Sequence, residues 1–412
     1  MAQPQAITYT SSVNTVVGGR TAIPSWVPPP GFMADVPEAN TFLSVKPIQT
    51  QELSSTAEPV QISDFYWQTI INDFSGGAYN PYWSPSGGDF GCMLFYGGGH
   101  SATNFNGIVA FDFFTRQYSV VYLGTPGENM YPVDLMTATY SDGQPGASHT
   151  YDLLDVLGPS AGYPKGALAI PAQHATFHVE SANSSTSFVF DFANQGAGWQ
   201  MKHAQTEYDS WGAGGAAAWD SANNRVYWIY AANNDRRLWW LDLPKSQMVI
   251  KSLDIGYTRS WASDNYQIMR FDHERNVLIV ADVNGDNRLS RNIYWMDVMD
   301  PSTLKRWNKA TVTSDFGSGP FGALMMAKDT HQGVWCCISN QQQGFVQYLR
   351  LPENLSDPWV FTKRPIAFAG GYSPSLSVGV VGRRWSYIPS LRSFALKTRA
   401  DQPMRLYTPE VI

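Results

Sequence analysis

Two histidines, His174 and His178, have a spacing that zinc-binding pairs often use. On a helix, residues four apart adjoin and can chelate one ion, but on a strand they lie about 13 Å apart. Every zinc ligand must reach within roughly 2 Å of the metal, and the residues around this pair have the composition of a strand. We therefore expect no metal here.

A second pattern, Asp282-Val283-Asn284-Gly285-Asp286, resembles the first half of a calcium loop. Such a loop needs glycine at its sixth position and glutamate at its twelfth, where this chain has Asn287 and Ile293. Asn-Gly is also the typical dipeptide of a tight hairpin turn. The sequence therefore predicts a polar hairpin, and neither a metal site nor another cofactor.

Aromatic side chains gather in segments that we expect to be loops or strand ends. Exposed tryptophan and tyrosine stack on sugar rings and anchor protein interfaces, and packing between neighbouring sheets is their structural alternative. The sequence leaves both roles open. The candidates for ligand binding are Tyr79, Tyr82, Trp83, Tyr131, Trp211, Trp261 and Tyr372.

The three cysteines are Cys92, Cys336 and Cys337. An odd number, with two of them adjacent, does not form a disulfide framework. All three stand in hydrophobic runs typical of inner strands, so we expect buried free thiols.

The elements that must position these residues repeat along the chain. A strand-like run ending in hydrophobic, aspartate, hydrophobic recurs at Asp112, Asp191, Asp242 and Asp297, and a degenerate copy carries Arg350. The successive steps are 79, 51, 55 and 53 residues. A period of about 50 residues in an all-β chain predicts a propeller of four-stranded blades. Six blades are evident, and residues 41–74 or the insertion described next would supply a seventh.

The first 60 residues differ from the rest in being rich in serine, threonine, proline and glutamine. We expect residues 1–60 to form an extended arm that lies on the propeller, a sister subunit or another protein, and residues 61–412 to form the propeller. A strand at residues 41–47 would pair with the last blade and close the ring. Residues 124–162 read as a long insertion between blades, and loops of this length are usually functional.

Composition excludes some classes of function. The net charge is −6 without a basic cluster, so we expect no nucleic-acid binding. No run approaches about 18 consecutive apolar residues, so we expect no membrane insertion. The first eight residues lack the basic and apolar regions of a secretory signal. Charged residues are only 15%, against about 25% in ordinary soluble domains, which fits a protein working outside a cytoplasm.

The first blade carries a recognisable motif. Phe95-Tyr96-Gly97-Gly98-Gly99-His100, followed by the run from Asn106 to Asp112 and then Thr115 and Tyr118, resembles a kelch repeat. Such repeats pair a diglycine after the second strand with an aromatic residue near the fourth, here Tyr118, Trp199, Trp307 and Trp359. Later blades keep the spacing and lose the diglycine. Over residues 75–412 the chain thus resembles kelch-like propellers of the galactose-oxidase kind.

This resemblance implies where catalytic residues would stand if the protein were an enzyme. Galactose-oxidase-like enzymes hold copper between histidines and tyrosines on one propeller face. Some propeller polysaccharide lyases use histidine, tyrosine and arginine there as base, acid and carboxylate neutraliser. The residues in comparable positions are His100, His149, His174, Tyr257 and Arg259.

The sequence favours a non-catalytic propeller that acts as a binding or assembly module. A phage tail or attachment protein, made in a bacterial cytoplasm and released by lysis, reconciles the composition with the absent export signal. We expect it in the virion or outside the lysed cell, and otherwise in the cytoplasm. Protein partners through the arm, a glycan ligand and a homo-oligomer are its expected contacts. The alternative is a kelch-like enzyme acting on carbohydrate, either a polysaccharide lyase or a copper oxidase.

Overall fold

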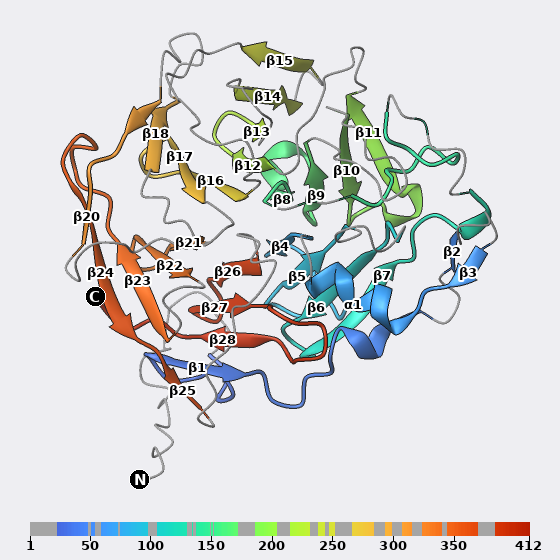
Figure 1. The fold of residues 1–412 in the computed structure, drawn as a ribbon, viewed down its shortest axis with the longest axis horizontal. Helices are drawn as coiled ribbons and strands as arrows, with labels where there is room; N and C mark the ends of the chain where they lie inside the picture. Colours follow the sequence, from blue (N-terminus) through green and yellow to red (C-terminus); the bar gives the residue numbers. More distant parts are fainter. Residues whose placement is uncertain are drawn as a thin grey trace.

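Six sheets are arranged radially around one axis (Figure 1). Within the residues described, the innermost strands of consecutive sheets contact one another around the circle, and β26 contacts β4 to complete it. The chain is therefore an all-β propeller of six blades, as the fifty-residue repeat predicts. The computed structural model describes residues 23–47, 51–53, 59–72, 75–97, 105–129, 134, 137–148, 150, 152–171, 186–203, 215–230, 238–243, 247–251, 266–283, 293–298, 307–314, 324–339, 344–369 and 384–412.

In the first four blades, consecutive strands pair antiparallel from the axis outward. Blade one is β4 (Gly77–Asn80), β5 (Cys92–Phe95), β6 (Ile108–Asp112) and β7 (Gln117–Tyr122). Blade two is β8 (Asp155–Leu157), β9 (Ala167–Ile170), β10 (Ser187–Asp191) and β11 (Trp199–His203). Blade three is β12 (Gly215–Asp220), β13 (Arg225–Tyr230), β14 (Leu238–Asp242) and β15 (Gln247–Lys251). Blade four is β16 (Tyr266–Asp272), β17 (Val277–Val283), β18 (Ile293–Asp297) and β19 (Asn308–Lys309).

The last two blades each have a fifth strand at the rim, which pairs in parallel. Blade five is β21 (Leu324–Asp329), β22 (Val334–Ser339), β23 (Phe345–Leu349) and β24 (Trp359–Pro365), with β20 (Val312–Ser314) outside it. Blade six is β26 (Trp385–Ile388), β27 (Ser393–Leu396), β28 (Arg405–Tyr407) and β1 (Phe32–Asp35), with β25 (Ala367–Phe368) outside it.

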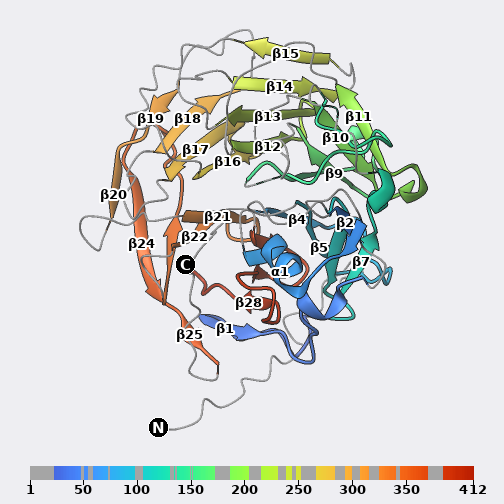
Figure 2. The ribbon, with the colours of Figure 1, turned by 45° about the vertical axis from the view of Figure 1, so that its right-hand side comes forward.

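The remaining elements are short. A hairpin of β2 (Gln51–Leu53) and β3 (Pro59–Gln61) precedes α1 (Asp64–Asn72). The described residues also form the 3₁₀ turns η2 (Leu43–Val45), η3 (Gly127–Asn129), η4 (Pro159–Ala161) and η5 (Gln195–Ala197). The helix lies beside blades one and six (Figure 2). Its Trp67 packs edge-on against Phe105, and its Asn72 accepts a hydrogen bond from the backbone of Ala400. Among the described residues, no helix combines the length and apolar character needed to cross a membrane.

The strand that closes the ring is not the one that the sequence predicts. The predicted strand at residues 41–47 is wrong, because residues 43–45 form η2 and Phe42 is buried against Trp67 at 5.1 Å between ring centroids. The closing strand is β1, which pairs antiparallel with β28 through Met33 and Tyr407. The innermost strand of blade two, β8, lies inside the segment 124–162. Neither 41–74 nor 124–162 therefore forms a blade of its own.

The repeated aspartates end the third strands of blades one to four, and the hydrogen bonds of their side chains explain why they recur at regular spacing. Asp112 Oδ1 accepts the backbone N–H groups of Phe114 at 2.8 Å and Thr115 at 3.3 Å. Asp191 does the same for Ala193. Such caps satisfy turn donors that have no strand partner and fix the turn to the outermost strand.

The hydrophobic core lies between the blades, where aromatic residues fill the wedge-shaped gaps. Tyr118, Trp199, Trp307 and Trp359, the fourth-strand aromatics, are all buried. Trp199, for example, packs edge-on against Tyr96 at 4.8 Å. The three cysteines are buried and free, as predicted. Burial raises the pKa of the Cys92 thiol well above its usual range, so this thiol is not a reactive nucleophile.

One lysine is buried where blades six and one meet. Lys397 follows β27, is 1% exposed, donates to the Gln402 carbonyl and lies 4.7 Å from the ring centroid of Tyr118. Burial lowers its pKa well below 10.5, and two arginines add to the effect while two carboxylates oppose it. The groups concerned are Arg405, Arg384, Asp401 and Asp35.

This lysine makes stability depend on pH in a definite direction. The unfolded chain binds the Lys397 proton more tightly than the folded chain, so stability rises with pH between the two pKa values. As the pH rises toward 10.5, we expect the unfolding free energy of the wild type to increase relative to Lys397→Met, by at most about 1.4 kcal/mol per pH unit. Urea titrations across this range measure the difference. The exposed Lys309→Met is the control and should leave the slope unchanged, and parallel profiles for wild type and Lys397→Met would contradict the argument.

Candidate functional site

One face of the ring is the face at which the innermost strands of the blades end. We call it the inner-turn face, and it is defined by the turns that follow β4, β8, β12, β16, β21 and β26. Turns of neighbouring blades touch there: Asn80 donates to the Lys165 carbonyl, and the Ser221 hydroxyl lies 3.2 Å from His273 Nδ1. Polar side chains from several blades therefore meet near the axis.

A second set of aspartates, which the sequence analysis missed, builds these turns. Asp220, Asp272 and Asp329 end β12, β16 and β21, and the Oδ1 of each accepts two backbone N–H groups of its turn. They recur 52 and 57 residues apart. A positive φ follows four residues later, at Asn224, Asn276 and Gly333. Each of these aspartates is followed five or six residues later by a valine, and this repeat is as regular as that of the third-strand aspartates.

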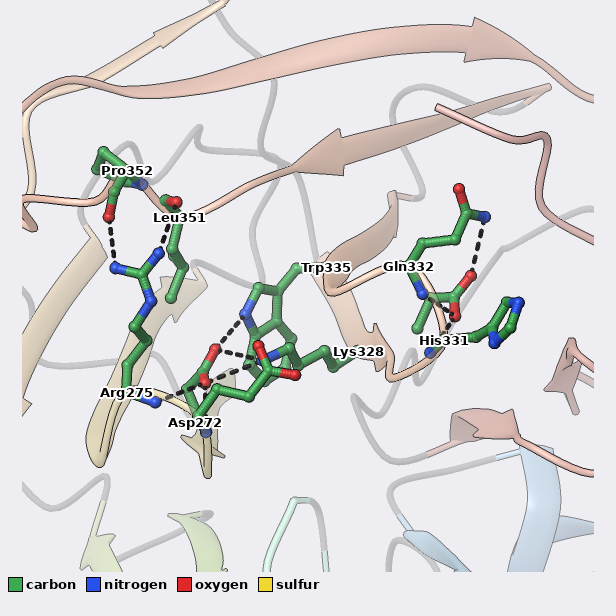
Figure 3. A network of polar contacts seen from close by, with 10 residues as sticks. Asp272, Arg275, Lys328, His331, Gln332, Trp335, Leu351 and Pro352 are labelled. Carbon is green, nitrogen blue, oxygen red and sulfur yellow. Dashed lines mark hydrogen bonds and ion pairs between the residues drawn. The ribbon is translucent and has the colours of Figure 1, made fainter.

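Asp272 is the centre of a polar network between blades four and five (Figure 3). Both its oxygens accept hydrogen bonds from Lys328 Nζ at 2.9 Å, and Oδ2 also accepts from Trp335 Nε1 at 3.1 Å. Lys328 contacts Glu274 at 2.9 Å as well. From the same turn, Arg275 donates to the Pro352 carbonyl at 2.8 Å. The network links two blades, and the charges of Asp272 and Lys328 are paired with each other within it.

The two histidines on this face differ in environment. His273 packs edge-on against Phe271 at 4.8 Å, and burial lowers its pKa below the usual 6.5 even though Asp220, Asp155 and Asp272 oppose this. Its imidazole is therefore neutral at pH 7. His331 is exposed, and Figure 3 shows it with Gln332 away from the Asp272 network.

A cavity of about 290 Å³ opens on the inner-turn face between blades five and six. The segment before β1 contributes Ile23 and Val27 to its wall, the segment after β28 contributes Pro409, and the turns contribute Asp329 and Leu391. Both ends of the described chain thus border one cavity. Two backbone hydrogen bonds hold the two segments together: Gly31 donates to the Thr408 carbonyl, and Thr408 donates to the Phe32 carbonyl.

No described residues form a group of three or more histidine, cysteine, aspartate or glutamate side chains that could hold a metal ion. In the described part of the chain, the acids of the inner-turn face serve as turn caps and blade contacts. This face thus combines a cavity of mixed apolar and polar lining with acids that are engaged in structural hydrogen bonds.

Three of the residues predicted to bind ligands lie in the described structure. The Tyr79 hydroxyl donates to the Phe90 carbonyl at 2.9 Å, and Trp83 stacks on Phe192 at 4.5 Å between blades one and two. Tyr82 is 46% exposed, and its ring lies against Gly158. Tyr82 alone of the three keeps an open surface for a ligand.

The other predicted residues lie outside the described residues. They are His100, His149, His174, Tyr257 and Arg259 among the catalytic candidates, and Tyr131, Trp211, Trp261 and Tyr372 among the ligand-binding candidates. In the sequence they fall between second and third strands, or between one blade and the next. None of them stands in a turn of the inner-turn face, so their convergence remains a prediction.

Comparisons with known proteins add little beyond the fold. No family model and no curated protein matches the chain. Among solved structures, a chain of the "Crystal Structure of Mitotic Checkpoint Complex" is similar over 96% of this chain and 97% of that one, with 9% identity and a TM-score of 0.41. The propeller assignment rests on the sheet topology, and no partner or activity carries over from that complex.

Proposed function

We propose that this propeller is a non-catalytic binding or assembly module. One observation carries the proposal. The segments before β1 and after β28 are hydrogen-bonded to each other and together line the cavity of the inner-turn face. The segment from Ile23 to Asp35 joins blade six through β1 and the cavity wall, so a partner that bound the preceding residues would be tethered to the ring. The acids of the same face are engaged in structural hydrogen bonds, which supports recognition over catalysis.

The finer class that we propose is a kelch-like propeller. Gly97, at φ +120°, supports it: a Cβ at this position would lie 2.7 Å from the Ser148 carbonyl oxygen, so only glycine fits. The buried fourth-strand aromatics add to this support. Both features are what kelch repeats require of the turn and the outer strand.

We place the module in a phage virion, as a tail or attachment protein whose N-terminal residues contact a neighbouring protein and whose exposed aromatic residues contact glycan. Low charge, high aromatic content and a ring closed by its own N-terminal segment support this role. Mass spectrometry of purified particles from the source culture tests it. The chain should be found at a fixed ratio to the major virion proteins, and its confinement to the soluble lysate would contradict the role.

Deletion of residues 1–22 tests the assembly function. The deletion leaves every described residue in place, so the melting temperature should not change. Native mass spectrometry of the full chain should show a defined oligomer, or a complex when the partner is co-expressed, and the shortened chain should be monomeric. A chain with residues 1–22 replaced by a glycine-serine linker of equal length is the matched control and should also be monomeric.

Two results would contradict the proposal. Full and shortened chains that are both monomers, with or without co-expressed virion proteins, remove the assembly role. Turnover of a polysaccharide by the purified chain removes the non-catalytic class and favours a lyase or oxidase.

A further inference from the structure

The cavity between blades five and six has the size and walls of a small-molecule site. Its volume is about 290 Å³, and Ile23, Val27, Pro28, Leu391, Pro409 and Val411 give it apolar walls. An engineered apolar cavity of about 150 Å³ holds one benzene ring, and ligand pockets begin at about 300 Å³. A molecule of two fused rings therefore suits this space.

One buried hydroxyl on the cavity wall has an oxygen that no donor reaches. Tyr387 is 7% exposed and lines the cavity; its hydroxyl lies beside the Asp329 carboxylate, which accepts its O–H, and none of the described residues donates a hydrogen bond to it. Burial raises the pKa of Tyr387 well above 10, and the nearby Asp329 carboxylate adds to this. The hydroxyl is therefore neutral at physiological pH. A buried oxygen that accepts no hydrogen bond is unfavourable, and a ligand that donates one to it gains affinity.

Arg392 and His331 also line the cavity, and the remaining polar groups around it are already engaged. The Thr408 hydroxyl lies 2.7 Å from that of Ser393, and the Gln332 side chain donates to the Glu410 carbonyl and accepts from the Ile412 N–H. Asp329 Oδ1 accepts two turn N–H groups, and Oδ2 accepts one hydrogen bond from Gln332 at 3.0 Å. The capacity left at the polar end is for accepting hydrogen bonds, at Tyr387 Oη and beside it at Asp329 Oδ2.

We propose that this cavity binds an uncharged, largely apolar molecule of two-ring size that donates one hydrogen bond to Tyr387 Oη. Asp329 and Arg392 place one charge of each sign on the lining, so a charged ligand of either sign would meet a like charge, and any charged group would lose its hydration against the apolar walls. A neutral N–H or O–H donor on an aromatic body meets both conditions. Ligand binding in this cavity and assembly through residues 1–22 are measured separately, so failure of one test does not decide the other.

Indole and benzothiophene test the proposal, because the two have nearly the same shape and only indole carries a donor. Isothermal titration of the full chain should show indole binding about fivefold more tightly than benzothiophene, the gain expected from one neutral hydrogen bond. Tyr387→Phe should reduce indole to the affinity of benzothiophene and leave benzothiophene unchanged, which also shows that the cavity of the variant is intact. Tyr294→Phe, at a half-buried tyrosine on β18 away from the cavity, is the matched control and should change neither affinity.

Methyl NMR locates the bound ligand without mutation. Indole should shift the methyl resonances of Val27, Leu391 and Val411, and leave that of Val360, an exposed valine on β24, in place. The proposal is overturned if neither ligand binds up to its solubility limit. It is equally overturned if indole and benzothiophene bind the wild type with equal affinity and Tyr387→Phe changes neither. Shifts confined to methyl groups outside the cavity would also overturn it.

Discussion

Replacing Asp152 with alanine is expected to lower the free energy of unfolding by about 3–5 kcal/mol, the usual effect of removing one partner from a buried ion pair. Asp152 is 1% exposed and lies just before β8. Its Oδ2 accepts hydrogen bonds from Arg270 Nη1 at 2.5 Å and from the Met269 backbone at 3.0 Å. The alanine variant would leave the Arg270 charge buried without this carboxylate.

The size of the effect follows from where the pair lies. The innermost strand of each blade has no strand neighbour toward the axis, so its backbone groups there need side-chain partners. Arg270 Nε donates to the Met326 carbonyl of β21 at 2.6 Å, and the Asp152 backbone exchanges hydrogen bonds with β12 at Gly215 and Ala217. One ion pair thus joins the blade-two segment to blades three, four and five.

Guanidinium titration measures this prediction. Asp357→Ala, in an exposed turn, is the matched control and should change stability by less than about 1 kcal/mol. The double variant Asp152→Leu, Arg270→Met should recover part of the loss, because it removes both charges together. An Asp152→Ala protein as stable as the wild type would show that the pair does not hold the blades.

Deletion of residues 1–36 is expected to abolish cooperative folding of the ring, whereas deletion of residues 1–22 should not. The longer deletion removes β1, which pairs with β28 on one side and β25 on the other. It also removes Met33, which is 2% exposed, and Asp35, which accepts a hydrogen bond from Arg405 at 2.8 Å. Burial of one such apolar side chain contributes about 1.5–3 kcal/mol, before the lost strand pairing is counted.

Hydrogen exchange and thermal unfolding distinguish the two chains. In the longer deletion, the amides of β28 should exchange rapidly and the protein should aggregate through its open edge. The chain lacking only residues 1–22 is the control and should match the wild type in both measurements. A chain without β1 that melts at the wild-type temperature would mean that the other strands hold the ring closed.

The sequence was sufficient for the architecture because blades one to four each carry an aspartate at the end of the third strand. Asp112, Asp191, Asp242 and Asp297 cap local turns, and local turns leave a local pattern. The blade number was left open between six and seven for the opposite reason. The innermost strand of blade two is only Asp155–Leu157 within a segment that reads as a loop.

The candidate site was harder to predict, because its parts meet only in three dimensions. Nothing near Phe32 in the sequence indicates that it pairs beside Tyr407, and nothing near Tyr387 indicates that Val27 lies across a cavity from it. The inner-strand aspartates were visible as a repeat, but their role as turn caps depends on the strands around them. Of the aromatic candidates, Trp83 shows that packing between blades and exposure on a loop give the same sequence signal.

Closure by β1 also sets the order of events when the chain is made. The strand that completes the last blade leaves the ribosome first, and its partner β28 follows some 370 residues later. At about 5–20 residues per second, synthesis alone separates the two by roughly 20–75 s. Until β25 is made, shortly before β28, Met33 and its neighbours have no native strand partner, so the nascent chain exposes an unpaired edge. The ring can lock only after translation is nearly complete, and occupancy of that edge by a chaperone would favour correct closure.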